Sequence, residues 1–236
     1  MSSRRKFLKK TTLASGIAIT ASSSAFGILS CKSEENPTVG HGDFKYKVDK
    51  NWGLQDPNNF PVEDCHEMVL DKNQRLIMTT THPKNNILIY NRSGKILDAW
   101  GTTFPGAHGL TLVEEGTEEF LFITDPNSHK VCKTTLKGEI LMTFETPREV
   151  AAYEKTNQFK PTETAVAPNG DIYIADGYGK DFIMQYDAKG NFIRHFGGHG
   201  AGAGQFDCCH GVTLDNRDPN NPTLLITSRS ANEFKR

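Results

Sequence analysis

The sequence predicts an all-β chain, a β-propeller built from repeated four-stranded units. A short motif recurs with its reference position at residues 66, 108, 162 and 210. Short segments with alternating apolar and polar residues follow each copy, and glycine, asparagine or aspartate turns separate these segments. One such unit cannot bury both of its faces, whereas several units packed radially around an axis bury all of them.

The recurring motif marks the first strand of each unit. Three copies of the motif closely resemble one another. A fourth copy, 161–166, has threonine where the other three have histidine. The closely matching segments are residues 65–70, 107–112 and 209–214. The reference positions are 42, 54 and 48 residues apart, the period typical of propeller blades.

Three further strands complete each unit, in chain order. The second strands are predicted over residues 76–80, 120–124, 171–175 and 223–227. The third strands are predicted over residues 86–90, 130–134 and 182–186, and the fourth over 95–100, 139–144 and 191–196. Their short length and their β-branched and aromatic residues exclude a helical solenoid of similar period.

The unit boundaries predict an incomplete ring. The predicted blades span residues 62–101, 106–145, 161–197 and 207–236, and residues 44–53 resemble a fourth strand that closes a propeller. A six-bladed ring would need about 90 more residues at about 40–45 per blade. We therefore expect a C-terminally truncated propeller of about three and a half blades plus the closing strand. A half-propeller that dimerises is the alternative.

The first 43 residues predict an export signal and a tether. Arg4 and Arg5 precede a weakly apolar run over residues 11–29, which is typical of a twin-arginine signal over residues 1–30. Residues 28–31 resemble a lipobox, so Cys31 is the expected lipid anchor and residues 31–43 the tether. We expect a periplasmic or cell-envelope protein. An amphipathic helix is the alternative for this segment.

The charge of the chain bears on its binding partners, and its cysteines bear on disulfide formation. The net charge is −1, but the first 30 residues carry five positive side chains and no acid, which leaves −6 on the rest. An acidic protein attracts no phosphate backbone, so nucleic acid is excluded as a partner. The four cysteines after the leader allow disulfides whose pairing the sequence leaves open: Cys65, Cys132, Cys208 and Cys209.

The repeats resemble NHL-repeat propellers, and part of the chain is similar to the peptidyl-α-hydroxyglycine α-amidating lyase family. The matching segments are residues 108–111 with 123–125, 161–166 with 175–178, and 206–214 with 226–229. The resemblance implies a six-bladed ring whose central channel holds zinc through three histidines. It places His108 and His210 as two of the ligands, Tyr178 as the base and Arg229 as the contact for an anionic group. The remaining ligand of the family comes from the sixth blade.

The residues give a physical reason for such a site. His66, His108 and His210 share one repeat position at the start of a channel-lining strand, so their imidazoles are expected to converge on the axis. Three imidazoles leave zinc an open position for water or substrate. A nearby cation would favour the charged form of Tyr178, and the guanidinium of Arg229 suits a carboxylate.

Other roles remain open for these residues. Each channel histidine is alternatively expected to bond a buried carbonyl or water, and calcium is a further candidate as a structural ion. Asp125 and Asp176 are predicted to hold their own turns. Glu163 is a weaker candidate for a cation or substrate contact. The other histidines, among them His129, are predicted to be solvated.

Two function classes follow from the sequence. One is an exported zinc-dependent lyase or hydrolase that acts on a small carboxylate or a hydroxyglycine-like compound at the channel mouth. The other is a non-catalytic propeller, anchored by lipid, whose mouth loops bind a glycan, a protein or a peptide-like ligand. A lactonase-like or strictosidine-synthase-like propeller is disfavoured, because the carboxylate-rich channel set of those proteins is not visible.

Overall fold

The computed structural model describes residues 37–236. They divide into two compact units, the first ending at Val48 and the second beginning at Asp49. The predicted twin-arginine signal and Cys31 lie outside the described residues. Within residues 37–236, no helix has the length and apolarity that a membrane span requires.

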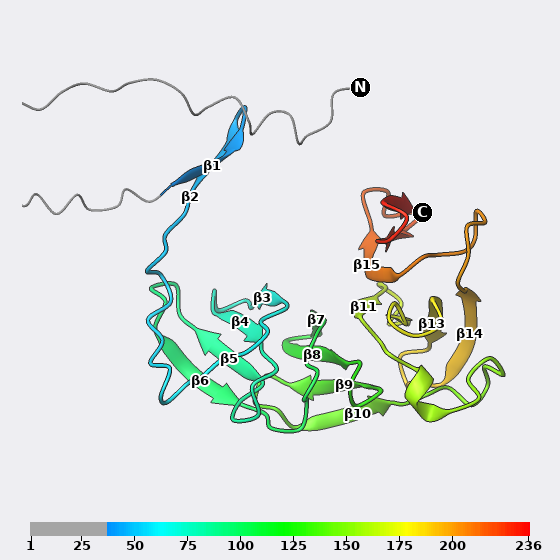
Figure 1. Cartoon of the computed structure of the whole chain (residues 1–236), viewed down its shortest axis with the longest axis horizontal. Helices are drawn as coiled ribbons and strands as arrows, with labels where there is room; N and C mark the ends of the chain where they lie inside the picture. The colour runs from blue at the N-terminus through cyan, green and yellow to red at the C-terminus, as the bar shows by residue number, and fades with distance from the viewer. Residues whose placement is uncertain (1–36) are drawn as a thin grey trace, which may run out of the picture. The chain divides into compact units, whose positions relative to one another are not determined.

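The first unit is a β-hairpin. Strands β1 (Thr38–His41) and β2 (Phe44–Lys47) pair antiparallel around a turn at Gly42, whose φ of 57° suits glycine (Figure 1). Part of the predicted tether therefore forms a strand, and β2 covers the start of the predicted closing strand. The proposal that residues 44–53 close a ring stays a prediction.

The second unit consists of four antiparallel sheets that follow one another in chain order (Figure 1). The first sheet contains β3 (Met68–Leu70), β4 (Leu76–Thr79), β5 (Ile87–Tyr90) and β6 (Ile96–Trp100). The second contains β7 (Leu110–Glu115), β8 (Glu118–Asp125), β9 (Lys130–Thr135) and β10 (Ile140–Phe144). The third contains β11 (Glu163–Val166), β12 (Ile172–Ala175), β13 (Phe182–Tyr186) and β14 (Phe192–Gly197). The fourth contains β15 (Cys209–Asp215), β16 (Thr223–Ser228) and β17 (Glu233–Lys235).

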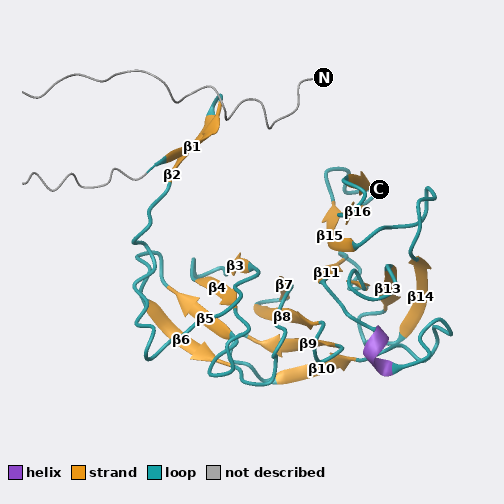
Figure 2. Cartoon of the chain, in the orientation of Figure 1, coloured by secondary structure: helices purple, strands orange, loops and turns teal. Residues whose placement is uncertain are grey.

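This architecture confirms the predicted all-β propeller fold with four-stranded antiparallel blades. Each sheet pairs its strands in sequence order, as consecutive hairpins require. The helical content of the described residues is one 3₁₀ turn, η2 (Thr156–Gln158), in the connection between β10 and β11 (Figure 2). The observed strands agree with the predicted segments to within a few residues.

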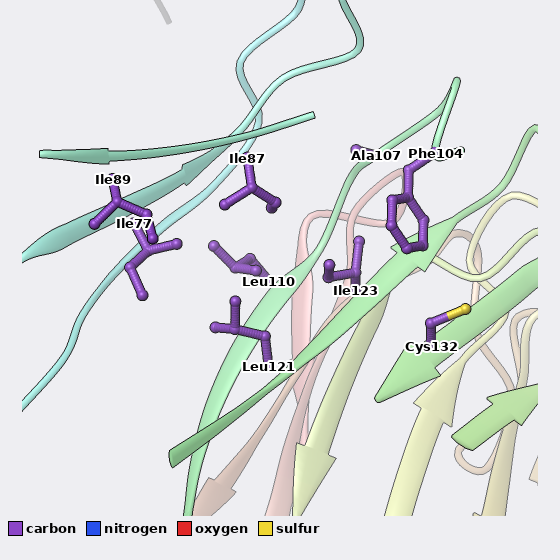
Figure 3. Packing of buried hydrophobic residues seen from close by; sticks show 9 residues of the cluster. All are labelled: Ile77, Ile87, Ile89, Phe104, Ala107, Leu110, Leu121, Ile123 and Cys132. Atoms are coloured by element: carbon purple, nitrogen blue, oxygen red, sulfur yellow. The ribbon is translucent and has the colours of Figure 1, made fainter. Parts of the chain in front are cut away.

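The core lies between neighbouring blades. Strand β8 shows how this works, because successive side chains of a strand point to opposite faces. Leu121 and Ile123 pack towards the first blade, whereas Phe122 packs towards the third. Figure 3 shows the cluster between the first two blades, where Ile77 and Ile87 are fully buried. Each such side chain contributes roughly 1.5–3 kcal/mol on burial, so packing of one blade on the next stabilises the unit.

The inner strands of successive blades lie side by side. Strands β3, β7, β11 and β15 are the first of their sheets, and each contacts the next along the chain (Figure 1). They line an open cavity of about 590 Å³. Residues at the starts of these strands therefore meet near one axis.

Cysteine pairing, which the sequence left open, is settled within the described residues. The thiols of Cys65, Cys132, Cys208 and Cys209 are all free. Three of them are buried, and Cys65 is exposed. No disulfide therefore crosslinks the blades in residues 37–236.

Candidate functional site

A threonine in the second strand anchors the start of the inner strand in three blades. Its hydroxyl accepts a hydrogen bond from the backbone N–H of the residue that follows the repeated histidine. The pairs are Glu67–Thr79 at 3.2 Å, Gly109–Thr124 at 2.7 Å and Gly211–Thr227 at 2.7 Å. The same local contact thus fixes the three histidine positions.

Gly109 allows the second and third blades to approach closely beside His108. A Cβ atom at this position would lie 2.5 Å from the carbonyl oxygen of Thr162 and 2.9 Å from the hydroxyl of Thr124. Both distances are shorter than real Cβ contacts, so a larger residue would push the inner strands apart. Gly109 is therefore a packing requirement of the site.

His108 lies at the centre of the candidate site. The residue is only 6% exposed, and Nδ1 of its ring lies 3.0 Å from the carbonyl oxygen of Thr162. A carbonyl only accepts hydrogen bonds, so Nδ1 carries the proton and Nε2 keeps its lone pair. Burial lowers the pKa of His108, which favours this neutral form.

His210 faces His108 from the fourth blade. The two ring centres are 4.9 Å apart with the planes at 65°. Burial, followed by the neighbouring His108 and Arg229, lowers the pKa of His210 to about 4. Both imidazoles are therefore neutral near neutral pH, the form that binds a metal ion.

Tyr178 places its hydroxyl between the two imidazoles. The oxygen lies 3.2 Å from Nε2 of His108 and 2.8 Å from Nε2 of His210. Gly177 makes this approach possible, since a Cβ there would lie 2.6 Å from the carbonyl oxygen of Cys209. The Tyr178 side chain is 38% exposed, so the hydroxyl lies at the edge of the site rather than inside the core.

Arg229 completes the contacts around the tyrosine. Its Nη1 donates to the Tyr178 hydroxyl at 3.2 Å, and the guanidinium lies 5.2 Å from the ring centre. The hydrogen bond to Tyr178 raises the pKa of Arg229. The residue is exposed, so one side of a permanent cation remains open to an incoming anion.

His66 lies in the cluster but in a different arrangement. It is exposed, and its ring stacks on that of His108 with centres 4.3 Å apart and planes at 28°. Ring nitrogens bind metals in the plane of the ring, so stacked imidazoles direct their lone pairs side by side instead of at one point. His66 and His108 each precede their inner strand by two residues, so the exposure of His66, not its place in the repeat, distinguishes it from the buried His108.

The donor set fits two ligands of a metal ion. The Nε2 atoms of His108 and His210 point at one oxygen, and the Thr162 carbonyl holds His108 in the ligating tautomer, as outer-shell partners of metal ligands do. Among residues 37–236, no group of three histidine, cysteine or acidic side chains is arranged to hold a metal ion. Two imidazoles are therefore what the described residues offer.

Aspartates at the ends of the second strands of the second and third blades, Asp125 and Asp176, hold their turns, as predicted. Asp176 is fully buried, and its carboxylate accepts hydrogen bonds from the backbone N–H groups of Lys160 and Lys180, both at 2.6 Å, and from the Tyr153 hydroxyl at 2.5 Å. Burial raises the pKa of Asp176 to about 6. Asp125 binds the N–H groups of its own turn in the same way.

Below the histidines, two carboxyl groups line the cavity between the inner strands. Glu163 accepts hydrogen bonds from the Thr111 hydroxyl at 3.0 Å and the Thr164 N–H at 2.8 Å, and Glu67 lies beside it. Burial and the neighbouring Glu67 raise the pKa of Glu163 well above its usual range. Glu67 was missed in the sequence, although it follows His66 where the other histidine copies have glycine.

The chain is similar in sequence to NHL-repeat proteins and to amidating lyases. No protein-family model matches it. It is 36% identical over 108 residues to a probable peptidyl-α-hydroxyglycine α-amidating lyase of Caenorhabditis elegans, covering 45% of this chain and 30% of that protein. It is 31% identical over 136 residues to the human NHL repeat-containing protein 3, and the match covers 55% of this chain and 39% of that protein. The chain thus spans well under half the length of these relatives.

Solved structures show the same fold. A streptogramin B lyase superposes with a TM-score of 0.56 at 17% identity, covering 78% of this chain and 53% of that one. A virginiamycin B lyase from Staphylococcus aureus superposes with a TM-score of 0.52 at 14% identity, and the match covers 81% of this chain and 58% of that one. At these identities the match concerns the propeller fold alone.

Proposed function

We propose that the described blades contribute to a zinc-dependent lyase site that acts on a small carboxylate with a hydroxyglycine-like group. The observation that carries the proposal is the contact of one hydroxyl, that of Tyr178, with Nε2 of both His108 and His210 and with Arg229. The similarity to amidating lyases supports the same reaction class.

His108 and His210 would hold the metal ion through Nε2. A bound zinc ion supplies Lewis-acid polarisation of a substrate oxygen. The proposal includes a further imidazole ligand, from His66 or from another blade of the expected six-bladed ring. The proposal also includes calcium as a structural ion.

The side chains have separate roles in the proposed reaction. Arg229 binds the substrate carboxylate through its guanidinium. Tyr178, as a phenolate, takes the proton of the substrate hydroxyl. The C–O bond becomes a carbonyl while the C–N bond breaks, and the nitrogen leaves with a proton. An amide and an α-oxo acid are the products, and the phenolate is restored when the proton reaches the nitrogen.

The experiment is an assay of the full-length protein with N-acetyl-α-hydroxyglycine, with zinc present and after chelation. We expect acetamide and glyoxylate to form in equal amounts, only with zinc and not in the His108→Ala protein. The matched control is His195→Ala, because His195 is exposed on the outer strand β14. Loss of turnover in His108→Ala must occur with the circular dichroism spectrum unchanged.

The same assay separates the proposal from the alternative of a non-catalytic binding propeller. A full-length protein that releases no glyoxylate with or without zinc, and whose stability is unchanged by chelation, would contradict the lyase proposal.

Export by the twin-arginine route and lipid anchoring at Cys31 belong to the proposal as well. A reporter protein fused to residues 1–43 should reach the periplasm, and Arg4→Lys with Arg5→Lys should prevent it.

A further inference from the structure

The connection between the second and third blades forms a pocket of its own. It runs over residues 145–162 and is longer than the connections between the other described blades. Val150 and Phe159 bury it against the unit, and the Thr146 hydroxyl donates to the carbonyl of Thr156 at 2.6 Å. The connection is therefore held in place by buried side chains and by an internal hydrogen bond.

A pocket of about 420 Å³ lies between this connection and the turn that carries His129 in the second blade. Its volume is within the range of small-molecule sites, about 300–1,000 Å³. It is separate from the cavity between the inner strands, because the two share no lining residue.

Four charged side chains line this pocket, two of each sign. Arg148 and Lys155 are cationic, whereas Glu145 and Glu154 are anionic, and all four residues are exposed. In residues 37–236, none of these four forms an ion pair with another side chain. Each charge is therefore free to pair with a group of a ligand.

His129 adds a neutral hydrogen-bond acceptor to the same wall. Its Nδ1 lies 2.8 Å from the carbonyl oxygen of Phe159, so Nδ1 carries the proton and Nε2 keeps a lone pair. The backbone of His129 is left-handed, with φ of 57°, which is uncommon for a residue other than glycine. The prediction that His129 is simply solvated was wrong, because it is half-buried and bonded to the connection.

We propose that this pocket binds a zwitterion of dipeptide size. The ligand carboxylate pairs with Arg148 and Lys155, and the ligand ammonium pairs with Glu145 and Glu154. A guanidinium offers a carboxylate two parallel hydrogen bonds, which fixes its orientation as well as its charge. A ligand with a single charge satisfies only half of the lining, so the mixed charges select against simple cations and anions.

The pocket is connected to the loop that carries Tyr178. Tyr153 lines the pocket and donates its hydroxyl to Asp176 at 2.5 Å, and the Tyr178 N–H donates to the Lys160 carbonyl at 3.3 Å. The occupant therefore lies against the connection that supports the lyase site. The zwitterion site itself needs no metal and stands apart from the proposed lyase reaction.

Isothermal titration calorimetry of the full-length protein with alanyl-alanine tests the proposal. We expect one binding site, and at least about tenfold weaker binding for N-acetyl-alanyl-alanine and for alanyl-alaninamide, each of which lacks one charge. Binding should be the same with and without zinc, which separates this result from that of the lyase assay.

Two variants test the charge assignment. Arg148→Gln and Glu154→Gln should each weaken alanyl-alanine binding at least about tenfold. The matched control is Glu149→Gln, an exposed charge in the same connection that does not line the pocket, and it should bind as the unaltered protein does. The proposal is overturned if alanyl-alanine gives no binding heat, or if Arg148→Gln and Glu154→Gln leave the affinity unchanged.

Discussion

The hydroxyl oxygen of Tyr178 lies 2.8 Å from Nε2 of His210, across the boundary between the third and fourth blades. The two residues are 32 positions apart in the sequence and meet only because β11 and β15 pack side by side. The contact joins a group that can act as a base to a group that can bind a metal ion.

Replacing Tyr178 with phenylalanine should abolish catalysis without loss of metal. The substitution removes the hydroxyl that Arg229 contacts, and loss of a general base costs about 10²–10⁴ in kcat. Turnover of N-acetyl-α-hydroxyglycine and the zinc content of the purified variant are the measurements. Tyr173→Phe is the control, because Tyr173 lies on β12 away from the histidines. Full turnover by Tyr178→Phe would remove Tyr178 from the mechanism.

Replacing Arg229 with glutamine should weaken substrate binding. Arg229 is the cation at the site that lies open to solvent, so its loss should raise KM at least about tenfold through the missing charge-assisted bond to the carboxylate. Steady-state kinetics measure this change. The control is Arg92→Gln, whose side chain donates to exposed Gln74, and it should leave KM unchanged. An unchanged KM in Arg229→Gln would show that the carboxylate binds elsewhere.

Replacing Asp176 with alanine should destabilise the protein by roughly 2–4 kcal/mol. The change leaves three donors without their acceptor: the Tyr153 hydroxyl and the backbone N–H groups of Lys160 and Lys180. Urea unfolding measures the free energy. Asp218→Ala is the comparison, since this exposed carboxylate accepts one turn N–H and should cost about 0.5 kcal/mol or less. Equal effects of the two variants would contradict the anchoring role of Asp176.

The protonation of His210 predicts a pH dependence of stability. Its pKa is about 4 in the folded protein, below the ordinary histidine value of about 6.5. Between these values the unfolded chain binds more protons, so the contribution of His210 to stability falls as pH drops from about 6.5 to about 4. The difference in unfolding free energy between the unaltered protein and His210→Gln should change across this window. A constant difference would contradict the lowered pKa.

The repeats made the blades and the convergence of His108 and His210 predictable. Both histidines share one repeat position at the start of the inner strand, where a threonine of the second strand anchors the backbone of the following glycine. The stacking of His66 on His108 was not predictable, because the repeat gives both residues the same position and does not reveal that His66 is exposed. The Thr162 carbonyl was missed for another reason: backbone atoms leave no mark in the residue pattern.

The segments between blades were the least predictable. Strand β1 falls where composition suggested a tether, β2 falls at the start of the predicted closing strand, and the turn between them contains a left-handed glycine, Gly42. The connection over residues 145–162 has no period, so neither its pocket nor the contact between Tyr153 and Asp176 could be inferred. Such segments are fixed by tertiary contacts rather than by local pattern.

The most direct test of the central claim is the position of zinc in crystals of the full-length protein, located by its anomalous scattering. The account predicts one zinc ion at about 2.0–2.1 Å from Nε2 of both His108 and His210, and no ion there in His210→Ala. Crystals grown with zinc in which those two nitrogens bind no ion, while Tyr178 keeps its place between them, would contradict it.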